Sequence, residues 1–175
     1  MDLSIIIVSY NTKELTLQTI QSVVNTIKEV EYEILVVDNA SKDDSVTAIK
    51  EAFPEVKMIC NKENLGFAKA NNIAIAKALG RYILLLNSDT IVKDEAIEKS
   101  VAFMDKHHQY GALGCKILLR DGTLDKACKR GFPTPWNSLC YFLKLDKLFP
   151  ENRKYGGYHM TYIDENEVSD IDCIM

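Results

Sequence analysis

The chain has 175 residues, which is enough for one domain with a sizeable core. It is 47% hydrophobic and 26% charged with only 8 Gly and 4 Pro, and this composition excludes collagen-like and wholly disordered proteins. The formal net charge of −4 predicts no nucleic-acid partner. The five cysteines show no CxxC spacing, so we expect reduced thiols in a cytoplasmic compartment instead of disulfides or a zinc ribbon.

Strand-like and helix-like patterns alternate along the first 106 residues. Continuous apolar runs predict buried strands at 3–8, 33–38, 56–60 and 82–86. Apolar residues at helical spacing predict helices around 20–27, 46–53, 67–79 and 97–104. This alternation with short links predicts an α/β fold, in which a mostly parallel, Rossmann-like sheet carries helices on both faces.

The pattern changes after residue 106. Residues 112–119 are predicted to form another strand, and the Asp-Gly pair within 120–123 predicts a turn. Residues 168–175 have strand character, yet the chain stops there without a turn or a polar tail. We therefore expect a single domain over residues 1–175 that is truncated at its C-terminus.

An aromatic, amphipathic stretch covers residues 136–148. Trp136, Leu139, Cys140 and Leu143 lie on one helical face, which favours packing into the core. The alternative is peripheral contact with a membrane near a lipid-linked acceptor. No apolar run in the chain reaches the length of a transmembrane segment.

Polar residues follow every strand of the first half, and in open parallel sheets ligands bind beyond these carboxyl ends. The strand ends read Ser9-Tyr10-Asn11, Asp38-Asn39, Cys60-Asn61 and Asn87-Ser88-Asp89. Asn, Asp and Ser also form turns and helix caps, which is the alternative explanation. The sequence has neither GxxxxGK[ST] nor GxGxxG, so a Walker loop and a dinucleotide-binding domain are not predicted.

Two of these strand-end positions and one glycine in a nearby loop have a definite chemical use. Asp38 can accept hydrogen bonds from the N–H of a pyrimidine base or from a ribose hydroxyl. Asp89 leaves a central strand, where its carboxylate can hold a divalent ion against a diphosphate. Gly66, before an Ala-rich helix, permits close approach of the backbone to a ligand.

Four motifs occur in order: SIIIVSYN at 4–11, VVDNAS at 36–41, NLGFAKANN at 64–72 and LLNSDT at 85–90. Together they resemble the nucleotide-sugar half of the family 2 glycosyltransferases, which have the GT-A fold. The bacterial rhamnosyltransferase-like branch is the most similar. The resemblance is good over residues 3–135 and vague beyond.

The resemblance implies a set of site residues. It places the nucleotide sugar against Ser9, Tyr10, Asn11, Asp38, Asn64, Gly66, Asn71, Asn87 and Ser88. Asp89 matches the last residue of the family's metal-binding Asp-x-Asp motif, while Asn87 stands at its first acidic position. A single carboxylate implies a weakly held Mg²⁺ or Mn²⁺ that the diphosphate helps to bind.

The implied reaction is an inverting transfer of a sugar, with rhamnose as a candidate. The donor would be UDP- or dTDP-linked and the acceptor a glycan or lipid-linked saccharide, in bacterial cell-surface polysaccharide synthesis at the inner face of the membrane. The general base is expected beyond Met175, so this chain alone should bind the nucleotide sugar better than it catalyses the transfer. Asp172 is a candidate acceptor-side residue. A catalytically inactive nucleotide-sugar-binding module and a nucleotidyltransferase are the alternatives.

Overall fold

The computed structural model describes residues 1–173 of the chain. The chain divides into two compact units, with the boundary between His107 and His108. The single domain expected over residues 1–175 stays a prediction, because one domain can contain two such units.

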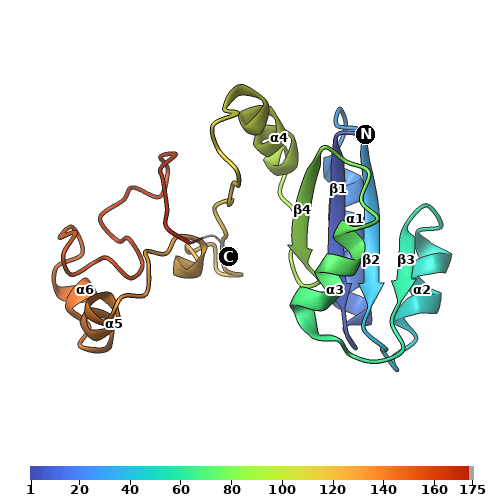
Figure 1. Cartoon of the computed structure of the whole chain (residues 1–175), viewed down its shortest axis with the longest axis horizontal. Coiled ribbons are helices and arrows are strands. Elements are labelled where there is room, and N and C mark those ends of the chain that lie inside the picture. Colours follow the sequence, from blue (N-terminus) through green and yellow to red (C-terminus); the bar gives the residue numbers. More distant parts are fainter. Residues whose placement is uncertain (174–175) are drawn as a thin grey trace. The chain divides into compact units, whose positions relative to one another are not determined.

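The first unit is built on a four-stranded sheet (Figure 1). Its strands are β1 (Leu3–Ser9), β2 (Tyr32–Asp38), β3 (Lys57–Cys60) and β4 (Tyr82–Asn87). The strands are all parallel and lie in the order β3-β2-β1-β4. The connecting helices are α1 (Lys13–Thr26), α2 (Ser45–Ala52) and α3 (Gly66–Ile75), and α4 (Ala96–Lys106) follows the sheet. The predicted α/β fold is confirmed.

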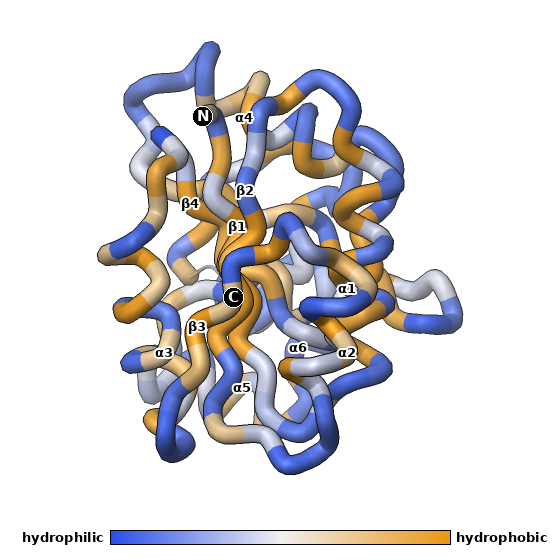
Figure 2. The backbone as a smooth tube through the Cα atoms, turned by 90° about the vertical axis from the view of Figure 1, so that its right-hand side faces the viewer, coloured by the Kyte–Doolittle hydropathy of each residue, from blue (hydrophilic) through white to orange (hydrophobic). Residues whose placement is uncertain are grey.

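The alternation of side chains along β1 creates two cores. Ile5 and Ile7 point to the face that α1, α2 and α4 cover, whereas Ile6 points to the face that α3 covers. Ala70 and Ala74 of α3 are fully buried against that second face, and their small size lets the helix lie close to the sheet. Figure 2 shows the resulting apolar stretches of the backbone along the strands. Over β4 the second face is open, and Ile83 and Leu85 are 43% and 47% exposed there.

Helix α3 ends at Ile75, earlier than the predicted 79. The N–H groups of residues 76–78 still bond within this segment, whereas those of Leu79 and Gly80 bond to side chains of the sheet. The N–H of Leu79 donates to Glu33 Oε1 at 2.7 Å, and the N–H of Gly80 donates to Ser4 Oγ at 2.8 Å. Ser4 Oγ in turn donates to Glu33 Oε1 at 2.6 Å, and Lys57 Nζ lies 2.7 Å from Glu33 Oε2. This buried network fastens the end of the α3–β4 connection to β1 and β2.

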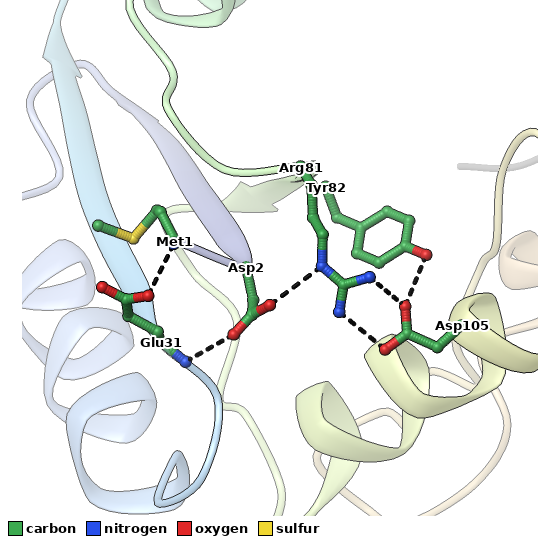
Figure 3. Close-up of polar contacts among 6 residues, drawn as sticks. All are labelled: Met1, Asp2, Glu31, Arg81, Tyr82 and Asp105. Carbon is green, nitrogen blue, oxygen red and sulfur yellow. Dashed lines mark hydrogen bonds and ion pairs between the residues drawn. The ribbon is translucent and has the colours of Figure 1, made fainter.

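A second polar cluster joins the start of the chain to β4 and α4 (Figure 3). Arg81 Nε lies 3.0 Å from Asp2 Oδ1, and Arg81 also forms a two-pronged ion pair with Asp105 of α4. The Tyr82 hydroxyl donates to the same Asp105 carboxylate at 2.9 Å. The two carboxylates raise the pKa of Arg81 above its usual value, so Arg81 stays charged.

The second unit contains a 3₁₀ turn at Lys126–Cys128 and two short helices, α5 (Pro135–Phe142) and α6 (Leu145–Leu148). The strand predicted at 112–119 is wrong: only an isolated bridge joins Leu118 to Leu124 across the predicted turn. The strand predicted at 168–175 is wrong over its described part, where Cys173 forms one bridge with Arg130. Residues 174 and 175 lie outside the described residues. An apolar run becomes a strand only where a partner strand pairs with it, and neither run has one among the described residues.

The interpretation of α5 as a core helix is also wrong. Trp136, Leu139 and Leu143 are 45%, 48% and 59% exposed, and only Cys140 of the predicted face is buried. Among residues 1–173, no helix is long and apolar enough to cross a membrane.

Candidate nucleotide-sugar site

The sheet register brings the ends of the four strands to one edge. Ser9 pairs with Asp38 across β1 and β2, and Val8 pairs with Asn87 across β1 and β4. Because all four strands are parallel, the loops that follow them leave the same edge of the sheet. The polar residues at the strand ends are therefore gathered there by backbone pairing alone.

Asp38 is the central charged group of this edge. Its side chain is only 3% exposed, and its Oδ2 accepts a hydrogen bond from the backbone N–H of Ser41 at 3.0 Å. Its Oδ1 is buried and has no hydrogen-bond partner among the described residues. A buried, unpaired carboxylate oxygen is costly, and a ligand N–H or O–H that reaches it would remove that cost.

The loops after β1 and β2 are joined by Asn11. Its Oδ1 accepts from the N–H of Lys42 at 2.8 Å, and its own N–H donates to Ser41 Oγ at 2.9 Å. Asn11 and Ala40 both have left-handed backbone, with φ of 53° and 65°, which Asn tolerates but which is strained for Ala. Tyr10 beside them is 47% exposed, so its ring is free to lie against a ligand.

Asp43 fastens the same loops to two helices. Its Oδ2 accepts from the N–H of Lys13 at the start of α1 at 2.9 Å, and its Oδ1 accepts from the hydroxyl of Ser45 at the start of α2. Burial by itself would raise the pKa of Asp43, but the hydrogen bonds from Ser45 and Lys13 outweigh it and lower the pKa. Asp43 therefore stays ionised and keeps the loop after β2 attached to the first residues of α1 and α2.

Asn39 is a site residue that the sequence analysis did not single out. It is 2% exposed, its Oδ1 accepts from Asn61 Nδ2 at 2.8 Å, and its Nδ2 donates to the carbonyl of Gly66 at 3.4 Å. It thus ties the end of β2 to the loops before α3. The available signal was its position directly after Asp38 in the strand-end motif.

The start of α3 is an open backbone turn. Gly66 has a φ of 76°, and a Cβ placed on it would meet nothing within 4 Å. Asn64 Oδ1 accepts from the N–H of Gly66 at 2.9 Å and fixes this turn. Asn71 is 4% exposed, and its Nδ2 donates to the carbonyl of Phe67 at 3.0 Å, so this part of its amide stabilises the helix itself.

Ser9 lies in the interior. It is fully buried, and its Oγ lies 3.1 Å from Thr12 Oγ1 and 3.0 Å from Thr16 Oγ1. Thr12 Oγ1 also donates to Ser88 Oγ at 3.4 Å, which links the start of α1 to the end of β4. Ser9 and Ser88 are thus connected through one threonine.

Asp89 is exposed, and its carboxylate makes no hydrogen bond or ion pair with any residue in the described part of the chain. Asn87, two residues earlier, is exposed as well. No group of three or more His, Cys, Asp or Glu side chains that could hold a metal occurs within residues 1–173. One free carboxylate fits a divalent ion that takes its other oxygen ligands from a bound diphosphate.

Asp172 belongs to the second unit. Its Oδ2 accepts from the N–H of Phe132 at 2.9 Å, and Asp172 and Asp170 are both exposed. Because residues 168–173 are not a strand, these two carboxylates do not lie on a common strand face.

Comparison with known proteins identifies the family. The family model described as Glycosyl transferase family 2 matches residues 4–166, so the chain belongs to this family. A glycosyltransferase of Haemophilus influenzae is 31% identical over 128 residues, which cover 71% of this chain and 38% of that protein. The matched regions of three such relatives cover 31% to 50% of their lengths, so the chain spans half of their length or less.

Two solved structures share the fold. Staphylococcus aureus TarS 1-349 in complex with UDP-GlcNAc has a TM-score of 0.60 at 23% identity, covering 78% of this chain and 38% of that one. A Pyrobaculum calidifontis mannosyltransferase in complex with GDP-Man and Mn²⁺ has a TM-score of 0.57 at 20% identity, covering 67% and 35%. At these identities the likeness establishes the GT-A fold.

Proposed function

We propose that this chain forms the donor-binding half of an inverting glycosyltransferase, which moves a sugar from a nucleoside diphosphate to a glycan or lipid-linked saccharide. The donor is UDP- or dTDP-linked, and rhamnose is a candidate sugar. Membership of family 2 supports glycosyl transfer over nucleotidyl transfer. We also propose a cytoplasmic location, a reducing compartment in which cysteines stay as thiols.

The unpaired Oδ1 of Asp38 carries the proposal. Uracil and thymine both have a ring N–H, and ribose has hydroxyls, so either part of the nucleotide can supply the missing donor. Exposed Tyr10 offers a ring face to the base, while Asn64 and Gly66 border the nucleotide from the α3 side. Asn11, Asn39 and Asp43 hold the edge around Asp38, and we assign Ser9, Asn71 and Ser88 the same positioning role.

At the end of β4 we assign Asp89 to a divalent cation, Mg²⁺ or Mn²⁺, with Asn87 beside the diphosphate. The bound ion would neutralise charge on the leaving nucleoside diphosphate. The solved mannosyltransferase of the same fold holds Mn²⁺ and a nucleotide sugar together. The general base stays predicted beyond Met175, with Asp172 as a candidate acceptor-side residue.

The test is a calorimetric titration of the chain with UDP and with dTDP, each with and without Mn²⁺. We expect micromolar binding, about −8 kcal/mol, to at least one nucleotide. Asp38→Asn keeps the shape of the side chain but replaces one acceptor oxygen with a donor, so binding should fall about tenfold or more.

Asp44→Asn is the matched control, because Asp44 is exposed on the same loop and makes no side-chain hydrogen bond with residues of the described chain. It should bind as the wild type does. Equal losses for both variants would assign the effect to net charge, and unchanged binding by Asp38→Asn would remove Asp38 from the site.

A further inference from the structure

Helix α5 turns its apolar side outward. At 100° per residue, Trp136, Leu139, Phe142 and Leu143 occupy one continuous arc of the helix. They are 45%, 48%, 78% and 59% exposed. A helix on the surface of a globular protein normally points such an arc at the core.

The inner side of α5 contacts the rest of the second unit through a cysteine, a tyrosine and an asparagine. Cys140 is fully buried, Tyr141 stacks on Tyr158 with ring centroids 4.7 Å apart, and Asn137 Nδ2 donates to the carbonyl of Phe132 at 2.8 Å. The Thr134 hydroxyl caps the helix by accepting from the N–H of Asn137 at 3.1 Å. The helix is therefore fixed in this orientation within the second unit, and the outward arc is its stable state.

The exposed arc continues into neighbouring aromatic residues. The Tyr155 ring lies 6.5 Å from Trp136 and 5.4 Å from Phe149, centroid to centroid, and Phe149 is 51% exposed. The indole N–H of Trp136 donates to the carbonyl of Lys154 at 2.9 Å, so the exposed ring has no unpaired polar atom. We call the outward residues of α5 together with Leu148, Phe149 and Tyr155 the α5–α6 patch.

The patch lies in a strongly basic segment. Residues 126–154 contain seven Lys and Arg but only two acidic residues, and one of these, Asp146, is 3% exposed. Lys144, between the two helices, and Lys147 and Arg153 are all exposed. Lys154 Nζ lies 5.5 Å from the centre of the Trp136 ring. Cations therefore border the exposed apolar side chains.

We propose that the α5–α6 patch binds the surface of an anionic lipid bilayer. Short helices with aromatic and Leu side chains on one side and lysines beside them insert the apolar side among the acyl chains, while the lysines meet lipid phosphates. A second copy of the chain fits the same surface poorly, because face-to-face pairing would bring two basic segments together. The proposal does not depend on the nucleotide assignment of the first unit.

Trp136 is the single tryptophan of the chain, so its fluorescence reports directly on binding at the patch. The intact chain is mixed with phosphatidylcholine vesicles with and without phosphatidylglycerol, at low and high salt. We expect a blue shift of Trp136 emission and co-sedimentation with the anionic vesicles, both weaker at high salt. Phe142→Ser should reduce partitioning about tenfold, and Lys144→Gln about fivefold at low salt.

Val168→Ser is the matched control, since Val168 is 77% exposed and Phe142 78%. It should partition as the wild type does, and circular dichroism should report the same fold for every variant. Equal losses for Phe142→Ser and Val168→Ser would overturn the assignment to the patch. Absence of vesicle binding, or equal binding to neutral and anionic vesicles, would overturn the proposal. The proposal would also be overturned if the chain self-associates without lipid and Phe142→Ser abolishes that self-association.

Discussion

At the residue scale, the candidate site depends on two carboxylates with opposite environments. Asp38 is buried with one oxygen satisfied by the protein, whereas Asp89 is exposed and free. Burial suits a group that must recognise a neutral base or ribose by hydrogen bonds. Exposure suits a group that shares a hydrated cation with a diphosphate.

We expect Asp89→Asn to abolish the part of nucleotide binding that depends on Mn²⁺ and to leave the metal-free part unchanged. The reason is that an amide is a much weaker cation ligand than a carboxylate. Asp94→Asn, an exposed carboxylate five residues along, is the control. Titrations with and without Mn²⁺ measure both, and a Mn²⁺ effect that survives in Asp89→Asn would refute the assignment.

A further prediction concerns buried Glu33. Burial alone would raise its pKa, but hydrogen bonds from Lys57, Ser4 and the N–H of Leu79 outweigh this and lower it. The ionised form is thus favoured in the folded state, so this stabilisation is complete above the unfolded pKa of about 4.3 and is lost as the pH falls below it.

Urea unfolding of Glu33→Gln at a series of pH values tests this stabilisation. The variant should be less stable than the wild type by about 1–3 kcal/mol at neutral pH. That difference should stay constant down to about pH 5 and shrink as the pH falls from there toward 3. A difference that is constant with pH would mean that packing, and not the charge of Glu33, causes it.

At the element scale, the connection from α3 to β4 is set by close backbone contact. A Cβ on Gly80 would lie 2.4 Å from the N of Ser4, which is a backbone atom of β1 and cannot move aside cheaply. Gly80 therefore marks the place where the chain passes the first residues of β1. It does not act as a helix cap, because α3 has already ended at Ile75.

Gly80→Ala should destabilise the protein by about 2–3 kcal/mol, because β1 would have to shift. The matched variant is Gly111→Ala, where a Cβ would meet nothing within 4 Å. It should change the stability by about 0.5 kcal/mol or less. Thermal unfolding of the two variants compares them directly, and equal stabilities would disprove the close contact with β1.

At the scale of the whole molecule, the chain consists of two compact units with the boundary after His107. Residues 107–116 have no helix or strand, and most of them are exposed. Proteases cleave such segments first, because their active sites need an extended, accessible stretch of chain.

Limited trypsin digestion should therefore cut first between Lys106 and Arg120 and leave a persistent fragment of the first unit. Mass spectrometry of the early products identifies the site. Nucleotide added beforehand should slow later cuts within residues 1–106 if the donor site is formed there. An initial cut inside the first unit would contradict the division into two units.

The sequence by itself determined the parallel sheet and the residues at its ligand-binding edge. Buried strands such as 3–8 and 33–38 are recognised from local apolar runs, and parallel pairing then brings their polar ends together without further information. The four ordered motifs were likewise enough to predict the family, because each motif is short and continuous in the sequence.

Only the tertiary structure decided which polar atoms remain unpaired and which apolar faces remain uncovered. The free oxygen of Asp38, the interior position of Ser9 and the bridging role of Asn39 depend on partners far along the chain. The outward face of α5 and the missing strand at 112–119 likewise depend on whether a distant segment packs or pairs with them. A local pattern states what a segment could bury or pair, but the fold determines whether a partner is there.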